Sequence, residues 1–143
     1  DNVHALAVYG LANSAAPTLI DNLTLMNNNT VRSQAHNADL SRFVVVGRNQ
    51  VSTISFDGTD LTLEDEEIAM MPITNIENRD VSVAGDDGEL AVVVYFTRDS
   101  MTNVVSGGGV VLYSINDADG ALTEVDSGAY PGPGRVALTV MAE

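Results

Sequence analysis

The residues of this chain best suited to bind a charged ligand are its arginines. There are six of them and no lysine, and Arg32, Arg79 and Arg135 each stand near the start of a strand-like run. Guanidinium groups bind phosphate and carboxylate through paired hydrogen bonds, so these three arginines together could form an anion site. Alternatively, they form ion pairs with Asp80 and its neighbours, and we favour the ion pairs.

A second candidate is the polar loop at residues 97–108, which is an insertion relative to the preceding part of the chain. Long loops in small domains often bind ligands or partners, although a surface insertion without a function is the alternative. The predicted ligand or partner contacts are Arg98, Asp99, Met101 and Asn103, together with Met70 and Met71 in the loop at residues 69–78.

The turn at residues 116–120 (Asn-Asp-Ala-Asp-Gly) offers Asp117 and Asp119 as oxygen ligands for calcium. It lacks the third acidic position and the distal Glu of a full calcium loop. Because Asp and Gly are also preferred in tight hairpin turns, we favour a turn without metal and predict no cofactor.

Groups suited to acid–base or nucleophilic catalysis are scarce. His4 and His36 are the only imidazoles, and neither lies in a Ser, Asp or Glu pattern typical of a catalytic triad. The run Glu-Asp-Glu-Glu at residues 64–67 is typical of a solvated outer strand. Because Cys is absent, there is no thiolate nucleophile, thiolate metal site or disulfide. We therefore predict no catalytic residues.

The charge balance excludes some partners. With 20 acidic residues, the formal net charge is −14, which disfavours nucleic-acid backbones and anionic membrane surfaces. The longest apolar run, at residues 90–96, is too short to span a membrane. The acidity indicates solubility through mutual repulsion or, alternatively, adaptation to high salt.

Strands, and not helices, must position these side chains. Apolar residues alternate with polar ones or form short continuous runs, and the helical repeat of apolar positions is missing. The hydrophobic content of 45% is sufficient for a core, and its β-branched residues favour sheets. Strands are predicted at residues 3–11, 18–25, 31–35, 42–47, 50–56, 60–65, 79–84, 89–96, 109–115, 121–126 and 135–140.

The strand pattern repeats along the chain. A Thr followed three positions later by an Asp recurs at residues 18–21, 62–65 and 123–126, each time in the position of a fourth strand. Phe-Val-Val-Val at residues 43–46 also matches Ala-Val-Val-Val at residues 91–94. Self-similar units of about four strands are the signature of a β-propeller. A β-sandwich with similar hairpins is the alternative.

The predicted fold is all-β, a partial β-propeller of about three blades of four-stranded antiparallel sheet. Residues 1–143 form a single propeller segment, with blade parts at about 1–26, 27–68, 69–128 and 129–143. Propellers close with roughly four to eight blades. Other protein chains, copies of this chain or the rest of a longer precursor are therefore expected to complete the ring.

A family resemblance supports this fold. Residues 80–94, 110–125 and 132–135 resemble the blades of lactonase-like and related bacterial or archaeal surface propellers, and residues 6–21 resemble a blade of the same broad group. The resemblance covers most of the chain. Because enzymes, binding proteins and structural proteins share these motifs, it implies a fold and not an activity.

Two functions are compatible with this sequence. The leading prediction is a non-catalytic structural or protein-binding segment, extracellular or associated with a cell or particle surface. It depends on the lack of catalytic groups and on the acidic composition without Lys or Cys. The alternative is a fragment of a lactonase-like hydrolase propeller, with acidic and Arg residues at the mouth of its channel. Neither prediction includes binding to nucleic acid or insertion into a membrane.

Overall fold

The computed structural model describes residues 4–12, 16–25, 31–68, 76–85, 88–99 and 101–131. These residues contain ten β-strands and no helix. Accordingly, this part of the chain has no helix long and apolar enough to cross a membrane. The predicted all-β class is confirmed, whereas the strand predicted at residues 135–140 lies outside the described residues.

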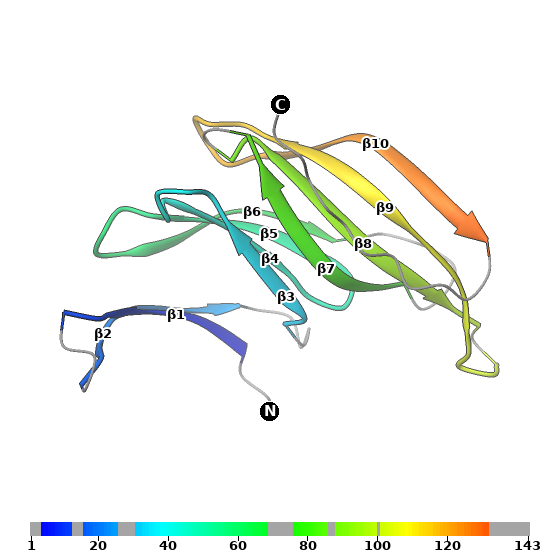
Figure 1. The fold of residues 1–143 in the computed structure, drawn as a ribbon, viewed down its shortest axis with the longest axis horizontal. Helices are drawn as coiled ribbons and strands as arrows, with labels where there is room; N and C mark the ends of the chain where they lie inside the picture. Colours follow the sequence, from blue (N-terminus) through cyan, green and yellow to red (C-terminus); the bar gives the residue numbers. More distant parts are fainter. Residues whose placement is uncertain are drawn as a thin grey trace.

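The strands form one hairpin and two four-stranded sheets, all antiparallel (Figure 1). Within each sheet, every strand pairs with its neighbour in the sequence. The hairpin is β1 (His4–Gly10) and β2 (Thr18–Leu25); the first sheet is β3 (Ser33–His36), β4 (Arg42–Val46), β5 (Gln50–Phe56) and β6 (Leu61–Ile68); the second is β7 (Ile76–Ala84), β8 (Leu90–Arg98), β9 (Val105–Ile115) and β10 (Leu122–Pro131).

The two central strands of the first four-stranded sheet, β4 and β5, are buried on both faces, as the continuous apolar run in β4 predicts. Val44 and Val46 belong to a core shared with Val81 and Val93 of the second sheet. Phe43 and Val45 point to the opposite face and pack with the β1–β2 hairpin. Because side chains alternate along a strand, one short strand supplies both cores.

Equivalent strands of successive sheets lie next to each other. The first strands, β3 and β7, are in contact, and Ser33 Oγ donates a hydrogen bond of 2.6 Å to Asp80 Oδ1 between them. The last strands β2, β6 and β10 also contact one another in that order. Sheets that stack in this way are typical of a propeller. The predicted partial propeller is confirmed, and the sandwich alternative is not.

Half of the predicted loop at residues 97–108 is strand, which corrects the sequence-based boundary. β8 continues to Arg98, and β9 begins at Val105. Gly107 and Gly108, which were predicted to lie in the loop, pair with Thr97 and Phe96 of β8, and Gly109 pairs with Tyr95. A Cβ at Gly109 would lie only 2.6 Å from the Tyr95 hydroxyl and 2.3 Å from the carbonyl oxygen of Gly128. Glycine is thus required here by close packing and not by a turn.

Candidate functional site

A buried carboxylate surrounded by arginines lies at the start of β7. The side chain of Glu77 is only 9% exposed. Its Oε2 is 2.5 Å from a terminal nitrogen of Arg79, and its Oε1 is 3.2 Å from Nε of Arg98 and 3.8 Å from Nε of Arg48. We refer to these four residues as the Glu77 cluster.

Three different elements bring the arginines together. Arg79 is an extra residue in β7: Asn78 pairs with Tyr95 and Asp80 with Val94, so Arg79 has no partner in β8. Such a bulge changes the direction of a side chain and is common near functional sites. Arg98 ends β8, and Arg48 lies in the turn between β4 and β5.

The turn that carries Arg48 is attached to β7 by buried hydrogen bonds. The backbone N–H of Asn78 donates to the Arg48 carbonyl oxygen at 2.7 Å. The Asn78 side-chain amide donates to the carbonyl oxygen of Gln50 at 3.1 Å. The backbone of Arg48 is therefore held in place, while its side chain is half exposed.

The Glu77 cluster carries two more positive than negative charges. Nε of Arg79 is buried without a hydrogen-bond partner, and Nε of Arg98, although 3.2 Å from Glu77 Oε1, makes no hydrogen bond of good geometry. Arg79 also lies over the ring of Phe96, 5.5 Å from its centroid, which is a cation–π contact. Surplus charge and spare donors are the properties that an anion-binding site needs. In a chain with a net charge of −14, this local excess is unusual.

The turn after β8 supports Arg98. Asp99 Oδ1 accepts the backbone N–H groups of Met101 and Thr102, at 3.0 and 2.7 Å, and these bonds, led by that of Thr102, hold the pKa of Asp99 below its usual value. Asn103 adopts a positive φ of 56°, and its carbonyl oxygen accepts a hydrogen bond of 2.9 Å from Arg98. The Met101 side chain is fully exposed.

Two residues named from the sequence, Arg79 and Arg98, meet in the Glu77 cluster, although the sequence assigned them to separate sites. The ion-pair partner of Arg79 is Glu77, whereas Asp80 accepts hydrogen bonds from Ser33 and Val81. Arg135, Met70 and Met71 lie outside the described residues.

Arg32 lies apart from the Glu77 cluster. It lines a cleft of about 400 Å³ between the β1–β2 hairpin and the first four-stranded sheet, together with Leu6, Val31 and Val45. None of the four residues of the Glu77 cluster lines this cleft. The anion site predicted from Arg32, Arg79 and Arg135 therefore stays a prediction, with Arg32 and Arg79 in different surroundings.

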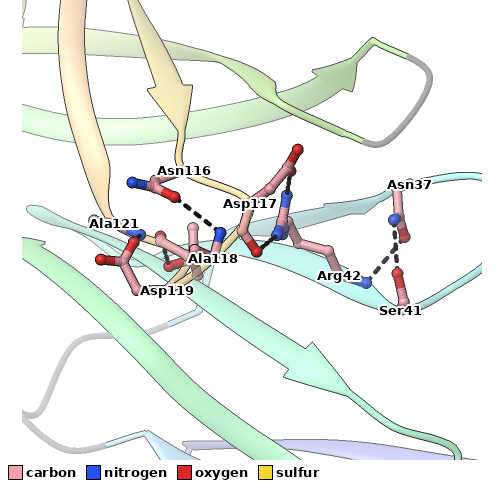
Figure 2. A network of polar contacts seen from close by, with 10 residues as sticks. Asn37, Ser41, Arg42, Asn116, Asp117, Ala118, Asp119 and Ala121 are labelled. Carbon is pink, nitrogen blue, oxygen red and sulfur yellow. Dashed lines mark hydrogen bonds and ion pairs between the residues drawn. The ribbon is translucent and has the colours of Figure 1, made fainter.

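In the turn predicted as a weak calcium site, the side chains of Asp117 and Asp119 contact other protein groups (Figure 2). Asp117 Oδ1 forms an ion pair of 2.8 Å with Arg42, which also donates to the Asp117 carbonyl oxygen at 3.2 Å. Asp119 Oδ1 accepts the backbone N–H of Ala121 at 3.1 Å. Among the described residues, no group of three or more His, Asp or Glu side chains could hold a metal ion.

The remaining imidazole that the structure describes has a packing role. His36 Nδ1 lies 2.8 Å from the carbonyl oxygen of Asn37, and its ring packs edge-on against Phe43, with centroids 6.0 Å apart. The side chain of His4 lies outside the described part of the chain.

Glu77 and Arg48 were not predicted from the sequence as members of the site. Glu77 was placed in a loop, yet it is the second residue of β7 and is buried. Arg48 is separated from Glu77 by two strands, so their proximity depends on how the sheets stack. A carboxylate two positions before an arginine at the start of an apolar strand was the only local signal.

Comparison with known proteins supports the fold. No protein-family model and no curated protein matches the sequence. A solved protein from Lactobacillus plantarum is 14% identical, with a TM-score of 0.67, covering 86% of this chain and 35% of its own. A protein from Bacteroides uniformis, described provisionally as a 6-phosphogluconolactonase, is 16% identical, with a TM-score of 0.60, covering 87% of this chain and 34% of its own. The chain thus spans about a third of the length of these neighbours.

These neighbours correct the leading functional prediction. One of these two neighbours carries the provisional name of an enzyme, a 6-phosphogluconolactonase. That finding contradicts the prediction of a non-catalytic structural or protein-binding segment. The finding favours the alternative, a fragment of a lactonase-like hydrolase propeller.

Proposed function

We propose that this chain is part of a lactonase-like hydrolase propeller and that the Glu77 cluster binds the anionic group of its substrate. The observation that carries the proposal is the convergence of Arg48, Arg79 and Arg98 on one buried carboxylate. This convergence gives the start of β7 a positive excess. The provisional enzyme name of one solved neighbour is consistent with an anionic sugar lactone as substrate.

Lactone hydrolysis suits an arginine site. Water gives up a proton to the solvent as it adds to the ring carbonyl, which leaves a negatively charged tetrahedral intermediate. When the ring C–O bond breaks, the leaving ring oxygen takes the proton of the new carboxyl group, and the product is a hydroxy carboxylate. Guanidinium N–H groups stabilise such developing charge and also bind a phosphate substituent. In this proposal, Glu77 fixes Arg79 and Arg98 in place, and the half-exposed Arg48 moves toward the bound anion.

The blades that would complete the propeller ring form a second part of the proposal. We infer that the four-stranded units are blades of a longer ring, because the chain covers only about a third of its solved neighbours. Other polypeptide segments or chains would close that ring and contribute the rest of the active site.

Turnover of a phosphorylated sugar lactone by the intact assembly tests this function. Arg48→Ala should raise the KM at least tenfold, since a charged hydrogen bond contributes roughly 1.5–3 kcal/mol. Glucono-δ-lactone, which has no phosphate, should be affected much less. Arg42→Ala is the matched control. Arg42, the first residue of β4, pairs with Asp117 in the turn between β9 and β10 and does not belong to the Glu77 cluster.

Three results would count against the proposal. They are an intact assembly without lactone turnover, equal effects of the Arg48 and Arg42 variants, and equal losses with the phosphorylated and plain lactones.

A further inference from the structure

The three outer strands β2, β6 and β10 share an irregularity at the same place. Each contains the pattern Thr-x-x-Asp, and in each the pairing register with the adjoining strand shifts immediately before the aspartate. A shift of this kind is a β-bulge, which redirects the side chains beside it. The unpaired residues are Ile20, Glu64 and Val125, and the aspartates that follow them are Asp21, Asp65 and Asp126.

Two of these aspartates connect one sheet to the next. Asp21 Oδ2 accepts the backbone N–H of Leu61 at 2.7 Å. Asp65 Oδ2 accepts the backbone N–H of Leu122, also at 2.7 Å. Leu61 and Leu122 are the first residues of β6 and β10, so each carboxylate holds the beginning of the outer strand in the following sheet.

The third aspartate has the same local geometry. Asp65 Oδ1 accepts the N–H of the next residue, Glu66, at 2.8 Å. Asp126 Oδ1 likewise accepts the N–H of Ser127 at 2.8 Å. Among the residues that the structure describes, nothing donates to Asp126 Oδ2, and no described sheet lies beyond β10.

We propose that Asp126 Oδ2 is the docking acceptor for a further four-stranded sheet, whose outer strand presents its first backbone N–H to this oxygen. The expected first residue is apolar, because Leu61 and Leu122 are both buried and belong to the cores between sheets. The surface beside β10 is therefore an interface for another blade-like sheet of the same design.

The sequence also excludes one obvious partner. Immediately before β2, the position equivalent to Leu61 and Leu122 is occupied by Pro17, four residues before Asp21. Proline has no backbone N–H. The β1–β2 hairpin of a second copy of this chain, placed next to β10, would leave Asp126 Oδ2 without its donor. The partner is a sheet other than that hairpin.

A lengthened chain tests the docking role. The full 143-residue chain is compared with the same chain extended after Glu143 by a second copy of residues 69–131, which supplies a further sheet beginning its outer strand with Leu122. In the extended chain, Asp126→Ala should raise the unfolding equilibrium constant roughly 10- to 100-fold, as expected for a hydrogen bond to a charged group. In the original chain, the same substitution should change it less than about threefold.

Two matched variants separate docking from local effects. Asp65→Ala in the original chain should show the full loss, because its partner Leu122 is already present. Leu122→Pro in the added copy removes the donor and should abolish the extra effect of Asp126→Ala. Equal effects of Asp126→Ala in the two chains would overturn the proposal. So would a dimer of the original chain, seen by sedimentation, that Asp126→Ala dissociates, because it would assign Asp126 to a second copy.

Discussion

At the scale of single residues, Glu77 determines how the arginines are arranged. It contacts Arg48, Arg79 and Arg98 from a nearly buried position. Without its negative charge, three guanidinium groups would face one another without compensation. Breaking a buried ion pair by removing one partner is more costly than losing the contact alone, because the other charge stays buried.

Glu77→Gln should therefore lower the free energy of unfolding by about 1 to 3 kcal/mol in urea denaturation. Inorganic phosphate should restore part of this loss, since a bound anion would supply the missing charge. Glu124→Gln, a change at an exposed position of β10, is the control and should have little effect. A Glu77→Gln variant as stable as the original chain would show that the carboxylate does not hold the cluster.

At the scale of elements, the strands could largely be predicted from the sequence, but their ends and contacts could not. The period-two pattern gives the side of the sheet that each residue faces, so the burial of β4 on both faces was expected. Part of the loop predicted at residues 97–108 was misassigned because two adjacent glycines among polar residues suggest a turn. The bulge at Arg79 has no sequence signature, and Arg48 meets Glu77 only through sheet stacking. Of the four residues of the Glu77 cluster, only Arg79 and Arg98 were therefore named from the sequence.

Gly109 tests the close packing of β9 against its two neighbouring strands. Gly109→Ala should lower the free energy of unfolding by about 1 to 3 kcal/mol, because its Cβ would collide with the Gly128 carbonyl oxygen and the Tyr95 hydroxyl. Gly128→Ala is the matched control, since the nearest atom to its Cβ is 4.0 Å away, in Val110. Similar stabilities of the two variants would indicate that residues 107–109 do not pack against β8 as described.

At the scale of the whole molecule, the charge distribution makes the Glu77 cluster distinctive. A net charge of −14 repels anions over most of the surface at low ionic strength. Half of the six arginines are nevertheless gathered at one end of β7 and β8. An anion that binds this protein is thus expected to bind at the Glu77 cluster. The acidic rest of the surface should not compete for it.

The most direct test is a titration of the chain with inorganic phosphate, followed by NMR of the arginine Nε–H signals at low ionic strength. The account predicts saturable shifts for Arg48, Arg79 and Arg98 with a Kd in the millimolar range or below, and no shift for Arg42, which is paired with Asp117. Absence of saturation at the Glu77 cluster, or equal shifts for Arg42, would contradict an anion site at the start of β7.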